Sequence, residues 1–313
     1  MDEAMLSIYV DVLYCIKSTG TTRMDTNKIA FTVMLMIAAS ALIAGTTLLA
    51  KSLGTDVLGP ALNPIQITAG RYIFALIALV ITTAIVRPNF TQPALRLHVG
   101  RAFAGTIGVT CMFAAATLIP LADATAINML NPIIAMLLAI PLLGESVGPR
   151  RWAAAGLSVI GAILLIRPGA SSFQPAALIA LLSALVLAVE IIIVKLLSRR
   201  EGTLQILLFS NGFGTLLACT TAILVWIWPT PMQWLALVGI GLLMVSAQSL
   251  FLFALRRGDA SFVAPLFYAT LVFAALYDFV IFDVIPSALS NTGAGIIILG
   301  AILIAWSEKR RKR

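Results

Sequence analysis

Residues Ala124 to Gly144 read ATAINMLNPIIAMLLAIPLLG, a stretch of 21 residues that contains no charged side chain. Its length matches the roughly 20 apolar residues that an α-helix needs to cross the hydrocarbon core of a bilayer. Asp123 precedes this stretch and Glu145 follows it, so a charge marks each of its ends. We therefore predict a transmembrane helix here.

The same pattern recurs along the whole chain. Hydrophobic residues make up 60% of the 313 residues and charged residues only 11%, a composition that cannot cover a soluble surface of ordinary polarity. One long uncharged run contains Trp228-Pro229-Thr230-Pro231, whose prolines predict a turn between two spans. The ten predicted spans cover residues 29–50, 67–86, 102–122, 124–144, 152–166, 168–189, two segments within 202–255, 260–282 and 284–307.

The unbroken Ala, Leu and Ile runs also argue against the other way of crossing a membrane. A transmembrane β-barrel would show segments of about ten residues in which apolar and polar side chains alternate. The runs in this chain do not alternate. The predicted fold class is therefore an all-α membrane protein with ten transmembrane helices.

The segment before the first span, residues 1–28, is expected to lie in the cytoplasm. Asp11 interrupts its apolar piece, so it predicts neither a signal peptide nor a span, and Met24 is an alternative start of translation. The cysteines Cys15, Cys111 and Cys219 are far apart and have no CxxC spacing. We therefore expect no disulfide framework, no metal site and no cofactor.

The basic residues predict the orientation of the chain in the membrane. If the amino terminus is cytoplasmic, all but three of the 21 Lys and Arg residues fall in cytoplasmic segments; Lys51 and Arg167 fall outside and Arg71 within a span. This asymmetry follows the positive-inside rule and places both termini in the cytoplasm. The net charge of +8 then reflects topology and contact with anionic lipids, and no aromatic-basic pattern indicates a nucleic-acid partner.

The second half of the chain repeats features of the first. The sequence GLSVIGAIL at Gly156–Leu164 corresponds to GIIILGAIL at Gly295–Leu303, an offset of 139 residues. Ala122–Thr125 and Gly258–Ser261 correspond at an offset of 136 residues, and each contains an Asp where a helix N-cap belongs. Two matches at nearly one spacing indicate a duplication.

The repeat divides the chain into residues 29–167 and 168–306, followed by a basic cytoplasmic tail at 307–313. Each unit holds five spans, an odd number, so the second unit enters the membrane in the opposite sense from the first. Inverted repeats place a binding site near the middle of the bilayer and let the halves rock between inward-open and outward-open forms. We therefore predict a five-plus-five inverted repeat, which is typical of a transporter.

Several short motifs follow one another through the first half. They are Arg71, Asp123-Ala124-Thr125, Asn131-Pro132, Leu142-Leu143-Gly144-Glu145 and the glycine-spaced fifth span. In this order the chain resembles the drug/metabolite transporter superfamily, in the form with two EamA-type repeats, over about Lys28 to Trp306. The second half departs from the family pattern, because Asp283 stands where the family usually has Glu and Pro265 is out of register with Pro132. The resemblance implies solute transport and does not name the solute.

Polar side chains within the predicted spans are candidates for the transport site, because such groups usually face the interior of a membrane bundle or a cavity. Asn128 and Asn131 are three residues apart and share one helix face, and Pro132 frees the backbone carbonyl of Asn128. These amides suit hydrogen bonding to an uncharged heterocycle or amide. The alternative is that they join neighbouring helices.

Glu190 is the deepest carboxylate of the sequence. It lies about four helical turns after Ala176 and five residues before Lys195. This position makes it a candidate for proton coupling or for contact with a cationic group of the substrate. Alternatively, it reaches the cytoplasmic interface or pairs with Lys195.

Four further residues complete the candidate site. Arg71 lies near the outer end of its span, within reach of lipid headgroups or of a substrate. Asp278 is a candidate partner for Arg71 and a second candidate for proton coupling. Gln248, with Phe251 on the same helix face, and Tyr268 predict a surface that stacks on a flat ring and hydrogen-bonds its edge, and ordinary aromatic packing is the alternative.

These observations predict a secondary transporter of a small organic metabolite in the bacterial inner membrane. The sequence has no GxxxxGK[ST] loop, so ATP is not expected to drive transport directly. Few buried charges beside several amides and aromatic residues favour riboflavin or a similar heterocyclic nutrient among the solutes that the resemblance implies. An amino acid or S-adenosylmethionine is the alternative.

Two other classes of protein stay open, a membrane enzyme acting on lipid and a scaffold that transports nothing. The enzyme would need clustered His, Asp or Glu side chains, whereas the single histidine, His98, is expected in a solvated cytoplasmic loop. We therefore expect a protein that is not an enzyme. Its expected partners are a small-molecule substrate and membrane lipids, with no nucleic acid, and assembly as a homodimer is left open.

Overall fold

The computed structural model describes residues 26–143, 149–166, 175–198, 200–257, 267–284, 287–296 and 298–299. Within these ranges the regular structure is entirely helical, and no strand occurs. The predictions for the segment before residue 26, for the motif at Gly258–Ser261 and for the tail at 307–313 lie outside the described residues. The structure therefore tests only some of the predicted segment boundaries.

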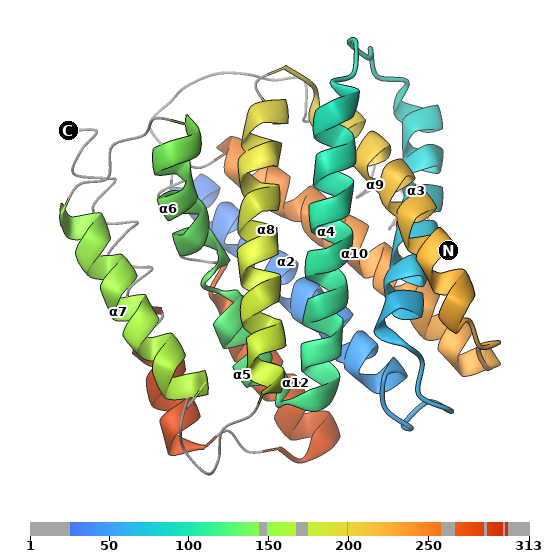
Figure 1. The fold of residues 1–313 in the computed structure, drawn as a ribbon. Helices are drawn as coiled ribbons and strands as arrows, with labels where there is room; N and C mark the ends of the chain where they lie inside the picture. Colours follow the sequence, from blue (N-terminus) through green and yellow to red (C-terminus); the bar gives the residue numbers. More distant parts are fainter. Residues whose placement is uncertain are drawn as a thin grey trace.

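The helices follow one another along the chain with short connections. Their bounds are α2 (Thr26–Leu53), α3 (Pro64–Val86), α4 (Leu95–Leu118), α5 (Leu121–Asn128), α6 (Asn131–Leu143), α7 (Pro149–Ile166), α8 (Ala176–Ser198), α9 (Thr203–Ala222), the short 3₁₀ helix η2 (Ile223–Val225), α10 (Pro231–Arg257) and α12 (Ala269–Phe282). Residues 288–296 are also helical. Figure 1 shows these helices as one bundle.

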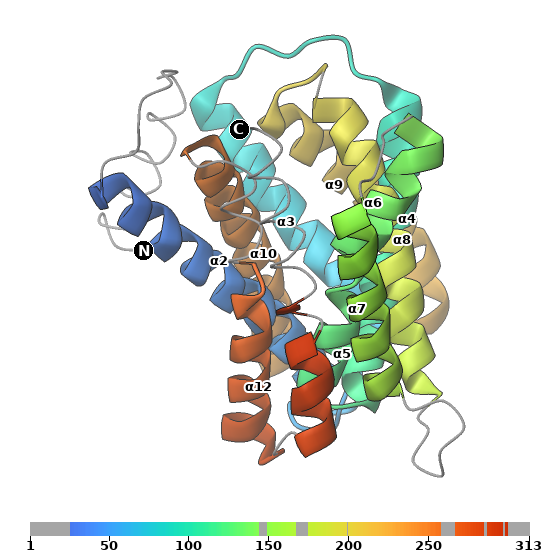
Figure 2. The same ribbon diagram turned by 90° about the vertical axis from the view of Figure 1, so that its left-hand side faces the viewer.

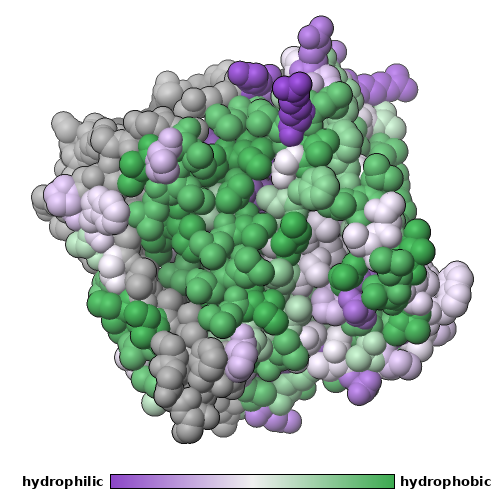
Figure 3. Space-filling model, viewed as in Figure 1, coloured by the Kyte–Doolittle hydropathy of each residue, from purple (hydrophilic) through white to green (hydrophobic). Residues whose placement is uncertain are grey.

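The exterior of the bundle is apolar and its interior contains polar side chains, the reverse of a soluble protein. Leu216, Leu235 and Val272 are exposed, whereas Gln66 and Asp278 are buried. Figure 3 shows hydrophobic residues across the middle of one face, with hydrophilic residues near its upper and lower edges. Because a lipid environment favours apolar outer surfaces, the chain is a helical membrane protein.

Seven helices of the described part are long and apolar enough to cross a membrane. They are Phe31–Leu53, Pro64–Val86, Leu95–Leu118, Leu121–Leu142, Ala176–Leu197, Thr203–Val225 and Pro231–Phe251. Ala269–Phe282 is apolar but shorter. These helices confirm the all-α membrane class, while the count of ten stays a prediction.

Two helix pairs form the framework of the bundle. α2 packs along α10, and α4 packs along α8. Figure 1 shows the α2–α10 pair behind the α4–α8 pair, and Figure 2, turned by 90°, shows the two pairs beside each other. Gly108 allows the close approach of α4 and α8, because a side-chain carbon there would lie 2.6 Å from Leu187 Cδ2. α3 lies against α9, and α5 lies against α12.

The helix that contains the opening stretch is broken. α5 ends at Asn128 and α6 begins at Asn131, so Met129 and Leu130 form a turn between them. The physical cause is Pro132, which has no N–H to donate to the carbonyl of Asn128. The sequence predicted the freed carbonyl and a span at 124–144, and the structure has an apolar span at Leu121–Leu142 that is interrupted by this turn.

The boundaries of two other helices differ from those predicted. α4 begins at Leu95 rather than at residue 102, and α2 continues past residue 50 to Leu53. The predicted span began too late in α4 and ended too early in α2, because His98, Arg101 and Lys51 were read as loop residues. These three side chains lie on helices and are buried.

Candidate functional site

A chain of hydrogen bonds links Asn128, at the break between α5 and α6, to α8 and, through Ser183, to α4. Asn128 Nδ2 donates to Ser183 Oγ of α8 at 2.8 Å, and Ser183 Oγ donates to the carbonyl oxygen of Gly108 in α4 at 2.7 Å. Asn131 Nδ2 donates to Asn128 Oδ1 at 3.2 Å. The two amides therefore share a face, as their spacing predicted, and Asn128 joins helices in this conformation.

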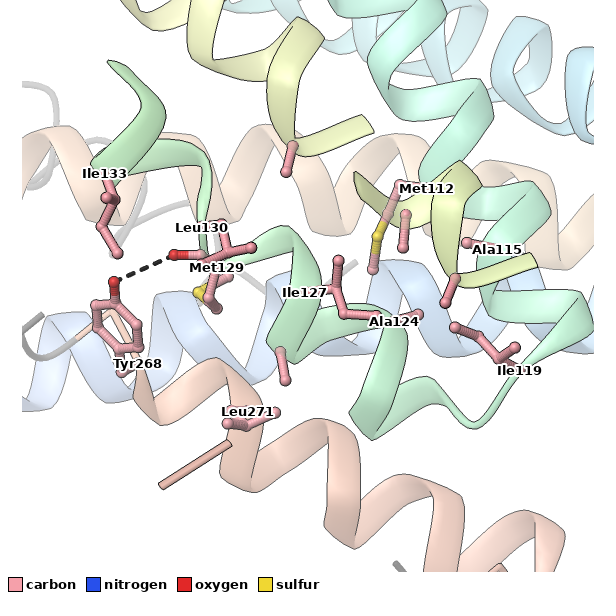
Figure 4. Close-up of a cluster of buried hydrophobic side chains, with 14 residues drawn as sticks. Met112, Ala115, Ile119, Ala124, Ile127, Met129, Leu130, Ile133, Tyr268 and Leu271 are labelled. Atoms are coloured by element: carbon pink, nitrogen blue, oxygen red, sulfur yellow. Dashed lines mark hydrogen bonds between the residues drawn. The ribbon is translucent and has the colours of Figure 1, made fainter. Parts of the chain in front are cut away.

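Tyr268 satisfies a carbonyl that the break sets free. Ile133 N donates to the carbonyl of Leu130, which leaves the Met129 oxygen without that helical donor. The Tyr268 hydroxyl donates to this oxygen at 3.2 Å, and Figure 4 shows the ring pointing at the turn. A residue 139 positions away along the chain thus holds the broken helix in place.

Glu190 of α8 forms an ion pair with Arg101 of α4. Arg101 Nε donates to Glu190 Oε1 at 3.2 Å, and its Nη1 donates to Ser210 Oγ of α9 at 2.8 Å. The Glu190 side chain keeps 22% of its surface exposed. This partner was missed because Arg101 was placed in a loop, although a helix beginning near Leu95 would have directed it inward.

Tyr72 of α3 lies beside this ion pair. A side-chain carbon added at Gly105 would lie 2.9 Å from the Tyr72 hydroxyl oxygen and 3.4 Å from Glu190 Oε2. The Tyr72 hydroxyl and the Glu190 carboxylate therefore approach the same point on α4. Gly214 of α9 leaves room for the ring, since a side-chain carbon there would lie 2.5 Å from Tyr72 Cε1.

A second buried polar cluster surrounds His98. Its Nε2 lies 2.8 Å from Glu201 Oε2, and its Nδ1 lies 3.4 Å from Ser210 Oγ. The sequence expectation of a solvated histidine is wrong, because α4 begins early enough to turn His98 inward, where it is fully buried. The spacing of three residues between His98 and Arg101, which places both on one helix face, was the available signal.

The pKa of Glu201 is lowered by its partners. Burial acts to raise this pKa, but hydrogen bonds from the Ala94 N–H, from His98 and from Gln205, together with the charge of His98, outweigh it. Glu201 Oε1 accepts from Ala94 N at 2.7 Å, and Oε2 accepts from Gln205 Nε2 at 2.8 Å. The carboxylate therefore ties the α3–α4 connection to the start of α9.

Asp278 is fully buried and pairs with Lys51 rather than with Arg71. Its second oxygen accepts from the Ala122 N–H at the start of α5, at 3.2 Å. The Lys51 ammonium also lies over the Phe282 ring, 4.3 Å from its centroid. The expected pairing of Arg71 with Asp278 is wrong, because α2 extends to Leu53 and places Lys51 against the Asp278 carboxylate.

Arg71 is buried, with 5% of its surface exposed. Its guanidinium lies over the Tyr72 ring, 4.7 Å from the centroid. Nη1 is completely buried and has no hydrogen-bond partner among the residues that the structure describes. The sequence left Arg71 within reach of either lipid headgroups or a substrate. Its burial agrees with a position inside the bundle and not with contact to headgroups.

Gln248 lies half-buried on α10. Phe251, one turn further, packs edge-on against Phe267, with 5.7 Å between the ring centroids. The structure therefore divides the predicted site residues. Asn128, Asn131 and Tyr268 meet at the helix break, Arg71 lies over the Tyr72 ring and Glu190 near its hydroxyl, and Asp278 belongs to a separate ion pair.

A pocket of about 630 Å³ opens beside the start of α4, far from the helix break. It is lined by Pro93, Ala94, Leu95, Arg96, Leu97, Leu196 and Arg200. Ala94 N also donates to Glu201, so the pocket borders the His98 cluster. Within the described ranges no three His, Cys, Asp or Glu side chains are arranged to hold a metal ion.

Known proteins share both the sequence pattern and the fold of this chain. The model of the EamA-like transporter family matches residues 30–167 and 174–306. An S-adenosylmethionine uptake transporter of Rickettsia prowazekii (strain Madrid E) is 28% identical over 258 residues, which cover 81% of this chain and 86% of that protein. A riboflavin transporter of Vibrio cholerae (serotype O1, strain El Tor Inaba N16961) is 29% identical over 252 residues, covering 78% and 83%.

A solved structure described as a crystal structure of a protein has the same fold. Its TM-score is 0.59 at 23% sequence identity, and the match covers 85% of this chain and 95% of the other. The two matches of the family model together span most of the described helices. The chain therefore belongs to the EamA-like transporter family.

Proposed function

We propose that the chain is a secondary active transporter that moves a small organic metabolite across the bacterial inner membrane by alternating access. The observation that carries this proposal is the break at Met129 and Leu130, which lies within the apolar span Leu121–Leu142. Broken membrane helices bring backbone carbonyls and polar side chains to the depth at which transporters bind substrate. The family match and the names of the two relatives support the same function.

We further propose ten spans in a five-plus-five inverted repeat with both termini in the cytoplasm. In this arrangement α2 and α8 are equivalent, and so are α4 and α10. The two framework pairs, α2–α10 and α4–α8, are then the same contact made twice. The pair α3–α9 is formed by two equivalent helices, and α5–α12 joins parts of the equivalent fourth and ninth spans, as expected for halves related by a two-fold axis.

The charges of the interior favour a zwitterionic substrate. Arg71 and Arg101 are buried, and Glu190 is mostly buried, whereas the sequence predicted few buried charges and favoured riboflavin. We propose an amino acid or S-adenosylmethionine, whose charged groups match such a site, and the Rickettsia relative supports this choice. Riboflavin is the second candidate, supported by the Vibrio relative and by the aromatic pair Phe251–Phe267.

We propose Glu190 as the residue that couples transport to protons. Protonation of this carboxylate would weaken its bond to Arg101 and so loosen α8 from α4. Asp278 is less suited to this task, because its two oxygens are held by Lys51 and by the Ala122 N–H. The remaining exposure of Glu190, 22% of its side chain, leaves it accessible to a proton.

Uptake by proteoliposomes tests the proposal. Labelled S-adenosylmethionine, methionine and riboflavin are offered with and without a pH gradient, and the wild-type protein is expected to concentrate at least one of them. Glu190→Gln is expected to lose the response to the gradient, while Thr220→Ala, which removes an exposed hydroxyl bonded to its own helix, keeps it. Fluxes equal to those of protein-free liposomes would favour a lipid-acting enzyme or a scaffold instead.

A further inference from the structure

The interior of the bundle contains a cation, Arg71, that has no counter-ion among the residues that the structure describes. Three acidic side chains of the described part of the bundle pair with other basic residues: Glu190 with Arg101, Glu201 with His98, and Asp278 with Lys51. Arg71 has no ion pair or hydrogen bond with any residue in the described ranges and only lies over the Tyr72 ring. An arginine stays charged when buried, and an unpaired buried charge destabilises a fold.

An unpartnered hydroxyl lies at the same level of the bundle. α3 and α4 run antiparallel (Figure 1), and Thr110 Oγ1 donates to Thr68 Oγ1 at 2.9 Å. Arg71 is three residues after Thr68, and Thr106 is four residues before Thr110, so both lie about one turn from this bond in the same direction. Thr106 Oγ1 is buried and, like Arg71 Nη1, has no partner among the described residues.

We propose that Arg71 and Thr106 form the subsite that binds the carboxylate of the transported metabolite, an inference that rests on the proposed function. The guanidinium presents a planar fork of donors that matches the two oxygens of a carboxylate. The Thr106 hydroxyl supplies one further donor. The Tyr72 ring lies 4.7 Å from the guanidinium carbon, and this cation–π contact helps to hold the guanidinium in place.

The surroundings of Tyr72 select a zwitterion over a simple acid. Arg71 lies over the face of the ring, and the Glu190 carboxylate lies near its hydroxyl. A ligand beside Tyr72 would therefore lie close both to the Arg71 cation and to the Glu190 anion. The substrate class is a metabolite that carries a carboxylate and a nearby positive charge, such as an amino acid or its sulfonium derivative.

Binding measurements on the purified full-length protein in detergent test the subsite separately from transport. The probes are S-adenosylmethionine, methionine and methioninamide, in which an amide replaces the carboxylate. The wild-type protein is expected to bind methionine about tenfold to a hundredfold more tightly than methioninamide, the range for a hydrogen bond to a charged group. Arg71→Gln is expected to bring this ratio close to one, and Arg71→Lys to reduce it in part.

Two further readouts separate binding from a structural role. Without ligand, Arg71→Gln is expected to unfold at the same or a higher temperature than the wild-type protein, because it removes an unpaired charge. Thr106→Val is expected to lower the preference for methionine over methioninamide. Thr83→Val, which removes another buried hydroxyl without a described partner, is expected to leave this preference unchanged. Thr83 lies three helical turns beyond Arg71, far from the proposed subsite.

The outcomes distinguish this inference from the proposed function. Equal binding of methionine and methioninamide by the wild-type protein, or a ratio that survives in Arg71→Gln, would overturn the carboxylate subsite. Selective binding without uptake by proteoliposomes would leave the subsite standing and overturn the transport proposal. Uptake of riboflavin alone, unchanged in Arg71→Gln, would overturn the subsite and keep transport.

Discussion

At the scale of single residues, the polar contacts depend on where each helix begins. Asn128 and Asn131 were paired correctly because they are only three residues apart, and the turn at Met129 and Leu130 keeps their side chains together. Arg101 and His98 were missed because a charged residue near the end of an apolar run looks like part of a loop. Contacts such as Lys51 with Asp278 join residues 227 positions apart, and no local pattern encodes them.

Glu201 gives a prediction at this scale. Glu201→Gln removes the carboxylate that contacts His98, Gln205 and the Ala94 N–H and so weakens a buried hydrogen-bond cluster. It is expected to lower the free energy of unfolding by about 1–3 kcal/mol at neutral pH. Because the pKa of Glu201 is lowered in the folded protein, this stabilisation is complete above the ordinary pKa of a glutamate, about 4.3. It is lost as the pH falls through the lowered value.

Unfolding of the detergent-solubilised protein by heat or denaturant, followed by circular dichroism at several pH values, measures this difference. Asp56→Asn is the matched control, because Asp56 is exposed and accepts a single hydrogen bond, from Ala61 N at 3.1 Å. The control is expected to change stability little at any pH. Equal stability of Glu201→Gln and the wild-type protein at neutral pH would contradict the prediction.

At the scale of helices, the sequence around Pro132 indicated where the helix is interrupted, but it did not indicate which residues hydrogen-bond to the interruption. Pro132 in the sequence was enough to predict that a carbonyl of the preceding turn is free. The partners of the break come from elsewhere in the chain: Ser183 from α8 and Tyr268 from the segment before α12. Tertiary packing therefore decides whether the two halves of the span bend, separate or continue as one helix.

Asn128 and Asn211 test this reading of the break as a matched pair. Each is buried with 6% of its surface exposed, but Asn128 bonds across helices, whereas the Asn211 amide bonds to the carbonyl of Leu207 in its own helix at 2.8 Å. Asn128→Ala is expected to cost about 1–3 kcal/mol of stability, because Ser183 and Asn131 lose a buried partner. Asn211→Ala is expected to cost less.

Uptake rates in proteoliposomes accompany the stability measurements for this pair. A variant that frees the break from α8 is expected to transport more slowly, since the geometry of the freed carbonyls is no longer fixed. Asn211→Ala is expected to keep the wild-type rate. If both variants behave alike in stability and in uptake, the asparagine at the break has no role beyond filling space.

At the scale of the whole molecule, the apolar runs were sufficient for the fold class, since uncharged segments of about 20 residues have few other uses. The order of the helices in space was not predictable in the same way. The pairing of α2 with α10, and of α4 with α8, joins segments from opposite halves of the chain. The proposed inverted repeat accounts for both pairs, because a two-fold axis relates each contact between the halves to a second, equivalent contact.

The proposed topology makes the last prediction. With the amino terminus in the cytoplasm, the α2–α3 connection lies outside and the α3–α4 connection, flanked by Arg87 and Arg96, lies inside. Single cysteines introduced as Asp56→Cys and Asn89→Cys, in a chain whose native cysteines are replaced by alanine, place one thiol on each side. In intact spheroplasts a membrane-impermeant maleimide is expected to label the first position, and the second only after permeabilisation. The reverse pattern would show an inverted chain, in which the basic residues do not set the orientation.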